Sequence, residues 1–141
     1  MDWNLALSVG GGPTYVNNIN NAPLIVDADK KEYYKQPEFY AIGHFSKFLV
    51  PDSHRIALKS DKTVDKLMTL AFVRPDGGTV VIAMNEKCEE LMLTIGDGGR
   101  HVSHILKAHS INNFVFYWTE SPDFLKFLIQ WLNSYFCPQL L

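Results

Sequence analysis

The spacing of apolar and polar residues changes twice along the chain. Over residues 36–48, apolar side chains recur at the three-residue spacing of a helix face, at Phe39, Ile42 and Phe45. Pro37 fits the first helical position because the N–H that proline lacks would be unsatisfied there. Glu38 follows in the first turn, where the positive end of the helix dipole favours an acidic side chain. The pattern predicts one helix of about three turns, ending near residues 50–51.

From residue 53 the apolar residues alternate with polar ones, which is the period of a half-buried strand. Pro75-Asp76-Gly77 indicates a hairpin, because proline presets φ and glycine accepts a positive φ. Short strands separated by turns at this spacing predict an antiparallel β-sandwich. The strands are expected at residues 54–59, 67–74, 78–85, 89–95, 101–107 and 113–118.

The chain before the helix is predicted to form strand, loop and strand. Residues 2–7 and 24–27 are short apolar runs that we expect to be buried strands. The chain opens in the first of these runs, with no earlier element to pair with it. We therefore interpret it as the C-terminal part of a larger protein. The glycines and proline at residues 10–13 lack the lysine and the spacing of a phosphate-binding motif.

Residues 17–21 contain four asparagines, which suit turns and left-handed backbone. Their amides can also hydrogen-bond a polyhydroxylated ligand such as a sugar, and loops on a rigid scaffold are where such groups usually lie. The alternative is a solvated loop. His44, near the expected end of the helix, has two interpretations as well. A protonated ring would favour the dipole there, or the residue is simply packed and hydrogen-bonded.

Composition excludes several classes of function. A net charge of −2 and a pI near 6.2 leave no basic surface for nucleic acid. His101 and His104 would point to opposite faces of a strand, and no metal site or cofactor is predicted. Cys88 and Cys137 can be free thiols or one bridge. No stretch reaches the roughly 18 apolar residues of a membrane span, and residues 1–4 lack signal-peptide features.

The tail departs from the alternating pattern. Ser121, Pro122 and Asp123 suit the start of a helix, and the residues that follow are apolar on nearly every side. We expect an apolar helical tail at residues 119–141. It can bury against a partner or lie at a membrane interface, although it lacks the basic face of interfacial helices. An incorrect chain end is the third alternative.

Several motifs together closely resemble the glucosylceramidases of glycosyl hydrolase family 30, over residues 2–118. Tyr-Lys-Gln-Pro followed by Gly-His-Phe-Ser-Lys-Phe, in this order and spacing, is the most specific of them. The motifs are Asp2-Trp3-Asn4-Leu5-Ala6-Leu7, Gly11-Gly12-Pro13, Tyr34-Lys35-Gln36-Pro37, Phe39-Tyr40, Gly43-His44-Phe45-Ser46-Lys47-Phe48 and Pro75-Asp76-Gly77.

The resemblance implies a retaining β-glucosidase of sphingolipid catabolism, located in the lysosome, with a (β/α)8 TIM barrel and an attached β-sandwich. Residues 1–50 would be the C-terminal end of the barrel domain, including its last strand and last helix. Residues 51–118 would belong to the β-sandwich domain, and residues 119–141 would be a divergent tail. The implied partners are glucosylceramide or another β-glucoside, a saposin-type activator and an anionic lipid surface.

The resemblance also implies substrate contacts. Trp3 and Asn18 match positions that line the glucose pocket, with an aromatic face for the sugar ring and an amide for its hydroxyls. Tyr15 stands at the pocket mouth where the family usually has tryptophan, and Ile19 replaces the usual phenylalanine. Retaining glycosidases need two carboxylates about 5–5.5 Å apart, and no residue here matches the family's catalytic glutamates. We therefore assign no catalytic residue and expect the chain by itself to be inactive. The alternative function is a non-catalytic β-sandwich binding module.

Overall fold

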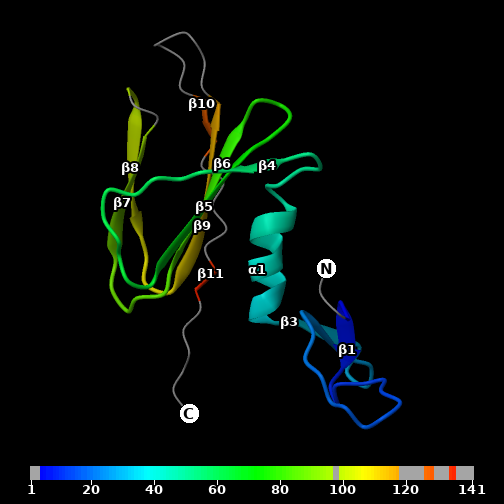
Figure 1. Cartoon of the computed structure of the whole chain (residues 1–141). Helices are drawn as coiled ribbons and strands as arrows, with labels where there is room; N and C mark the ends of the chain where they lie inside the picture. The colour runs from blue at the N-terminus through cyan, green and yellow to red at the C-terminus, as the bar shows by residue number, and fades with distance from the viewer. Residues whose placement is uncertain (1–3, 97–98, 118–125, 129–133, 136–141) are drawn as a thin grey trace. The chain divides into compact units, whose positions relative to one another are not determined.

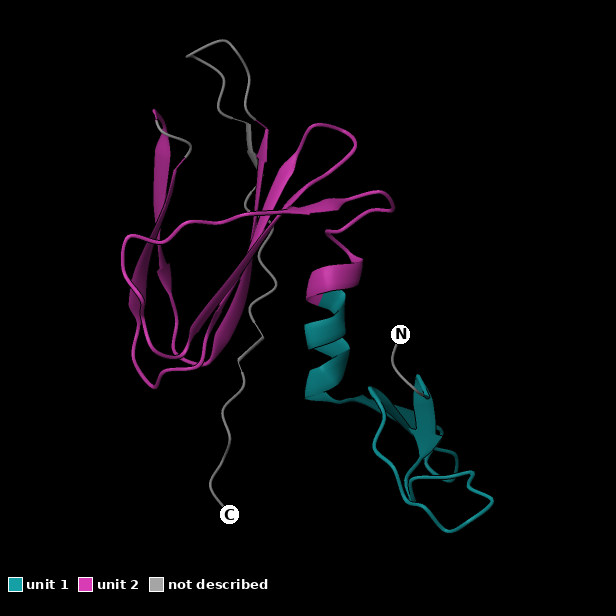
Figure 2. Ribbon diagram, in the orientation of Figure 1, with its two compact units in different colours: residues 1–43 teal, residues 44–141 magenta. Residues whose placement is uncertain are grey.

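The computed structural model describes residues 4–96, 99–117, 126–128 and 134–135. Figure 1 shows the whole chain, and Figure 2 colours its two compact units, Met1–Gly43 and His44–Leu141. Helix α1, Pro37–Ser46, crosses the boundary, so its last turn belongs to the second unit. Within the described ranges, no helix has the length and apolar character needed to cross a bilayer.

The first unit contains a small mixed sheet of three described strands. Strand β1, Ala6–Ser8, pairs in parallel with β2, Leu24–Asp27, and β2 pairs antiparallel with β3, Glu32–Lys35. In the described part of the run expected as a strand at residues 2–7, the strand begins at Ala6; residues 2–3 lie outside the described residues. Only Leu7 in β1 is buried, while Leu5 before it is 67% exposed. The expectation of a buried strand is wrong for these residues, because Ala6 and Ser8 on either side of Leu7 are exposed.

The apolar pattern of the sequence does not predict strand β3. The hairpin that creates it is closed at Asp27, whose carboxylate accepts from the backbone N–H of Lys30 at 3.2 Å and pairs with the Lys30 ammonium at 3.0 Å. Lys31 adopts a positive φ of 56° in the turn. The aromatic residues Tyr33 and Tyr34 then favour extended backbone, although both lie next to charged residues that hide the strand in the sequence.

Helix α1 begins at Pro37, as predicted, and ends at Ser46, about one turn before the predicted end. One further helical hydrogen bond, from the N–H of Leu49 to the carbonyl of Phe45, continues it briefly. The apolar stripe stays partly open, since Ile42 and Phe45 are 38% and 40% exposed. His44 is the fully buried residue of the helix.

The second unit is the antiparallel β-sandwich that the alternation predicts. Within the described residues, one sheet has the order β10-β9-β6-β5-β4, with β11 also paired to β9, and the other is β7-β8. Figure 1 shows β7 and β8 as a layer beside β5, β6 and β9. The strands are β4 (His54–Ile56), β5 (Leu67–Val73), β6 (Thr79–Asn85), β7 (Leu91–Gly96), β8 (His101–Leu106), β9 (Ser110–Tyr117), β10 (Lys126–Leu128) and β11 (Ser134–Tyr135).

The core of the sandwich lies between its two sheets. Phe114 and Phe116 stack from β9 with ring centroids 6.3 Å apart, and Leu106 and Ile95 meet them from the β7–β8 layer. Ala71, Val81 and Ala83 complete this cluster from β5 and β6. Burying apolar area at roughly 25 cal/mol per Å² is the main favourable term for such a fold.

The hairpin predicted at Pro75-Asp76-Gly77 joins β5 to β6. The N–H of Gly77 donates to the carbonyl of Arg74 at 3.0 Å, and the N–H of Arg74 donates to the carbonyl of Gly78 at 2.7 Å. Gly77 has a φ of +79°, the left-handed conformation that a three-residue hairpin loop requires at this position. The turn chemistry of the sequence is confirmed.

The helix predicted within residues 119–141 is not what the structure has where it describes this tail. Strands β10 and β11 pair antiparallel with β9 instead. The outer edge of β9 otherwise carries unpaired N–H and C=O groups, and a neighbouring strand satisfies them. The predicted helix start at residues 121–123 and the thiol of Cys137 lie outside the described residues.

Candidate functional site

The loop between β1 and β2, residues 9–23, carries two of the three predicted site residues, and we call it the Asn loop. It folds back on itself at Gly11, whose N–H donates to the carbonyl of Ser8 at 2.8 Å. A Cβ on Gly11 would lie 2.5 Å from Cγ2 of Ile19 and 2.8 Å from the carbonyl oxygen of Asn20. Because φ is also +73° there, the sequence needs glycine at this point for the loop to close.

The asparagines of the Asn loop divide into two kinds. The Asn20 amide donates to the carbonyl of Asn18 at 3.3 Å, and the Asn21 amide donates to the Glu38 carboxylate at 3.3 Å. These two amides hold the loop to itself and to the start of α1. Asn18 is fixed through its backbone N–H, which donates to Oγ1 of Thr14 at 3.1 Å. Within the described part of the chain, the amides of Asn17 and Asn18 have no hydrogen-bond partner, and Asn18 is the one at the position that the family resemblance assigns to the sugar pocket.

Tyr15 lies three residues before Asn18, and its ring is fully exposed. Val16 and Ile19 are also largely exposed, at 81% and 74%. The Asn loop thus presents an uncovered aromatic ring, exposed aliphatic side chains and the free amides of Asn17 and Asn18. Trp3, the third predicted site residue, lies outside the described residues.

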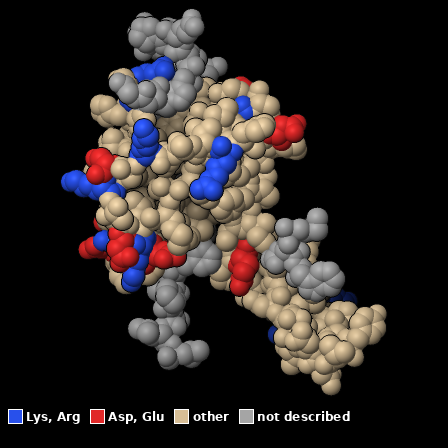
Figure 3. Space-filling view, viewed as in Figure 1, with Lys and Arg blue, Asp and Glu red and all other residues tan. Residues whose placement is uncertain are grey.

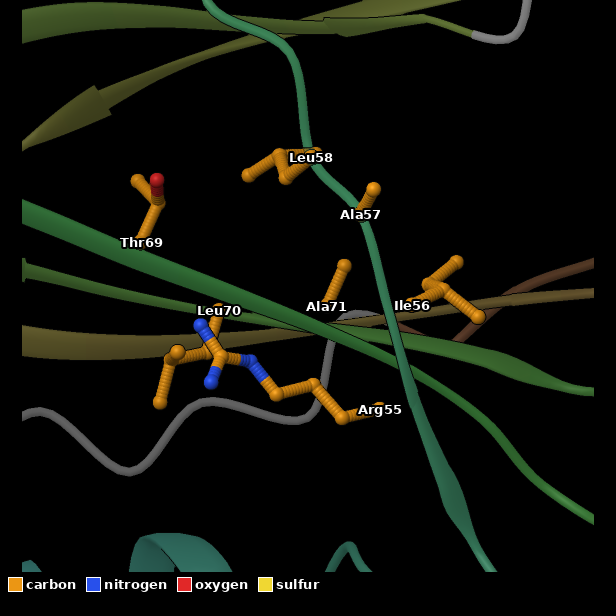
Figure 4. A pocket seen from close by; sticks show the side chains of 7 residues that line it. All are labelled: Arg55, Ile56, Ala57, Leu58, Thr69, Leu70 and Ala71. Carbon is orange, nitrogen blue, oxygen red and sulfur yellow. The ribbon is translucent and has the colours of Figure 1, made fainter.

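A cavity of about 360 Å³ lies in the second unit, between β5 and the segment that continues β4 (Figure 4). It holds none of the predicted site residues, and no carboxylate lines it, so it offers no acid or base for hydrolysis. Its lining consists of Arg55, Ile56, Ala57, Leu58, Thr69, Leu70 and Ala71.

Asp76 is the described carboxyl with the richest set of donors. The N–H of Gly78 donates to it at 3.0 Å and lowers its pKa, and the hydroxyl of Tyr117 at 3.0 Å and the guanidinium of Arg74 at 2.6 Å act in the same direction. A carboxyl held ionised in this way locks the β5–β6 hairpin. It is unsuited to be a general acid, which needs a raised pKa.

The remaining electrostatics indicate no further reactive centre in the described residues. No group of three or more metal-binding side chains gathers there. Figure 3 shows basic and acidic side chains interspersed on the face in view. Burial lowers the pKa of His44, and it also lowers the pKa of His104, whose ring meets Phe114 edge-on at 5.6 Å.

Comparison with known proteins finds matches to two domains of one family, one for each part of the chain. Residues 1–49 match the glycosyl hydrolase family 30 TIM-barrel domain, and residues 52–114 match the glycosyl hydrolase family 30 β-sandwich domain. Lysosomal acid glucosylceramidase of Mus musculus is 50% identical over 96 residues, which are 68% of this chain and 18% of that protein. Putative glucosylceramidase 3 of Caenorhabditis elegans is 35% identical over 105 residues, 74% of this chain and 20% of that protein.

Solved structures agree on the fold. SrfJ from Salmonella typhimurium matches with a TM-score of 0.78 and 27% identity, over 84% of this chain and 26% of its own. The endo-β1,6-glucanase BT3312 matches in fold with a TM-score of 0.73 and 24% identity, over 80% of this chain and 26% of its own.

The chain spans a fifth or less of the length of these curated relatives. Between them, the two family matches nonetheless leave only residues 50–51 and 115–141 unmatched. The expected architecture, the end of a TIM barrel followed by a β-sandwich, is therefore confirmed. The chain belongs to glycosyl hydrolase family 30 and carries the end of that family's barrel domain together with its β-sandwich domain.

Proposed function

We propose that this chain supplies the C-terminal part of a glucosylceramidase, a retaining β-glucosidase that hydrolyses glucosylceramide to glucose and ceramide. The observation that carries the proposal is the 50% identity over 96 residues to the mouse lysosomal acid glucosylceramidase. The same relative supports a lysosomal location for the parent enzyme. The barrel end is proposed to cover residues 1–50, the β-sandwich residues 51–118 and the tail residues 119–141.

The Asn loop is the proposed sugar-binding element. The free amide of Asn18 can donate to one glucose hydroxyl and accept from another, because an amide has both functions. The exposed ring of Tyr15 offers an apolar face at the mouth of the pocket. Trp3, just before the first strand, is proposed as the aromatic platform under the sugar ring.

The chain by itself is proposed to be inactive. Hydrolysis with retention needs an acid/base carboxyl and a nucleophilic carboxylate about 5–5.5 Å apart. Asp27 closes the β2–β3 turn and Asp76 closes the β5–β6 turn, so both carboxylates already have structural roles. The catalytic glutamates would come from earlier barrel strands of the parent enzyme.

The exposed apolar tip of the Asn loop supports a lipid substrate. Tyr15, Val16 and Ile19 leave water-exposed apolar surface beside the proposed sugar site. A ceramide chain, an anionic lipid surface or a saposin-type activator would cover such surface at a gain of roughly 25 cal/mol per Å². These are the partners proposed for the parent enzyme.

A hybrid enzyme tests the proposed function. In the mouse enzyme, the stretch that aligns with this chain is replaced by the corresponding residues of this chain. We expect the hybrid to release glucose from glucosylceramide within about tenfold of the mouse rate, a barrier change of about 1.4 kcal/mol. A second hybrid that exchanges only residues 9–23 carries less risk to folding and is expected to behave in the same way.

The isolated chain, assayed with a fluorogenic β-glucoside, is the matched reference and should show no turnover above buffer. Hydrolysis by the isolated chain would refute the inactivity. Folded hybrids that release no glucose would refute the glucosylceramidase assignment and favour the non-catalytic binding module.

A further inference from the structure

Two buried polar residues of the second unit, His44 and Asn113, are joined by two hydrogen bonds. His44, in the last turn of α1, has no exposed surface, and Asn113 on β9 is 3% exposed. Nδ1 of His44 is hydrogen-bonded to Oδ1 of Asn113, and the Asn113 amide donates to the backbone carbonyl of His44 at 2.7 Å. The two residues are 69 positions apart in the sequence. We call them the His44–Asn113 clasp.

The two hydrogen bonds together determine the proton on the histidine ring. The Asn113 amide nitrogen is the donor to the His44 carbonyl, so its other terminal atom, Oδ1, faces the ring. An amide oxygen only accepts hydrogen bonds. Nδ1 of His44 must therefore carry the hydrogen.

The clasp also satisfies a helix end. The last four carbonyls of a helix lack partners within the helix, and His44 contributes one of them, because α1 ends at Ser46. Asn113 reaches this carbonyl from a strand of the sandwich rather than from the residues that follow the helix. Phe48, four residues after His44, is 2% exposed, so the buried side of this turn continues along the same face.

We propose that the His44–Asn113 clasp is a conformational lock. Asn113 caps the end of α1 from β9 and fixes His44 as the Nδ1–H tautomer. In this way it sets the rotation of the last helical turn, with His44 turned inward. The proposal stands independently of the sugar site, since neither residue belongs to the Asn loop.

The chain offers a matched control for the test. Asn112, the neighbour of Asn113 on β9, is also buried at 6%, but its amide donates to Oγ of Ser110 only two residues away. Asn113→Leu removes both bonds of the clasp, and Asn112→Leu removes a bond within one strand. Hydrogen exchange, followed by mass spectrometry on the full chain, reports how often each segment opens.

We expect Asn113→Leu to speed exchange at residues 45–49 about tenfold relative to residues 79–85, and Asn112→Leu to leave that ratio unchanged. Equal ratios in the two variants would overturn the lock. Asn113→Asp keeps the acceptor for Nδ1 and loses the donor to the carbonyl. It should therefore open the helix end while the ring bond remains.

A spectroscopic measurement on the unmodified chain tests the tautomer without any substitution. In the ¹⁵N spectrum of labelled histidine, Nδ1 of His44 should carry the hydrogen. An unprotonated Nδ1 with a protonated Nε2 would overturn the proposal, even if Asn113→Leu fails to fold.

Discussion

Asn85 has no exposed surface, yet it lies at the end of an apolar strand. Its amide donates to the carbonyl of Glu89 at 2.8 Å and to the carbonyl of Lys107 at 2.9 Å. Its oxygen accepts from the N–H of Lys87 at 3.0 Å. One side chain thus ties the loop after β6 to the loop before β9, and both loops belong to the sandwich.

We predict that Asn85→Leu destabilises the chain by about 2–3 kcal/mol, because it leaves buried backbone groups without partners. Urea unfolding followed by circular dichroism measures the change. Thr94→Ala is the control, since it removes an exposed bond to Ser103 and should cost less than about 0.5 kcal/mol. Similar losses in the two variants would show that Asn85 does not hold the loops.

Burial gives His44 a pKa below its ordinary value of 6.5. As the pH falls from about 6.5, the unfolded chain binds a proton that the folded chain still refuses, so stability decreases with acid. We predict that the urea concentration at the midpoint of unfolding decreases as the pH is lowered from 8 to 5. In His44→Phe this decrease should be smaller.

His104→Gln is a second, parallel test of the same effect. The pKa of His104 is also lowered by burial, so the two variants should each remove a separate part of the slope. Asp76 affects stability over a more acidic pH range. Because its pKa is lowered, its contribution to stability is present above pH 3.8 and is lost as the pH falls below that value. An unchanged slope in His44→Phe would contradict the assignment.

Among the secondary-structure elements, two glycines have different backbone conformations. Gly77 adopts a φ of +79° in the β5–β6 hairpin, and Gly43 lies inside α1. A Cβ at either position would meet no other atom within 4 Å. Space is therefore available at both, and only backbone conformation distinguishes them.

Gly77→Ala should destabilise the chain by about 1–2 kcal/mol, because alanine resists the left-handed conformation. Gly43→Ala should stabilise it by about 0.5–1 kcal/mol, because glycine costs that much inside a helix. Thermal unfolding of the two variants side by side measures both. Changes of the same sign would contradict the backbone argument.

The sequence predicted those elements whose signals are local. The alternation of apolar and polar residues predicted the ends of β5, β6, β7 and β8 to within two residues. Pro75-Asp76-Gly77 predicted the hairpin between β5 and β6. Strand β3 was not predicted, because four residues with a charge at each end are too few to show the alternation of apolar and polar residues typical of a strand. The tail was predicted as helix from its apolar pattern, whereas its described strands depend on the edge of β9, which only the assembled sheet provides.

The candidate site was predictable only in part. Asn18, Tyr15 and Trp3 came from the family resemblance, since four asparagines in a loop do not reveal which amide stays free. That distinction depends on Glu38, whose carboxylate accepts from Asn21, and on Gly11, which lets the loop close. The His44–Asn113 clasp was beyond local patterns because its partners are far apart in sequence.

At the scale of the whole molecule, apolar exposure is concentrated in the first unit. Among its described residues, the buried apolar side chains are Leu7, Ala22 and Pro23. Large apolar side chains that are more than 60% exposed there include Leu5, Val9, Tyr15, Val16, Ile19 and Tyr33. Surface of this kind favours association with other apolar surfaces.

We predict that the purified chain self-associates as its concentration rises, and that it binds a hydrophobic dye more strongly than a covered globular domain does. Size-exclusion chromatography across a concentration series measures the association. Monomeric elution throughout, with dye binding no stronger than that of a covered domain, would contradict this prediction.

The proposed function requires that the Asn loop belongs to the glucose site of a glucosylceramidase. The most direct test compares kcat/KM for glucosylceramide between Asn18→Ala and Asn20→Ala in the hybrid enzyme. Asn18→Ala removes the free amide proposed to bind the sugar and should lower kcat/KM about tenfold. Asn20→Ala removes only a weak bond within the loop and should stay within about twofold. Equal effects of the two substitutions would contradict the claim.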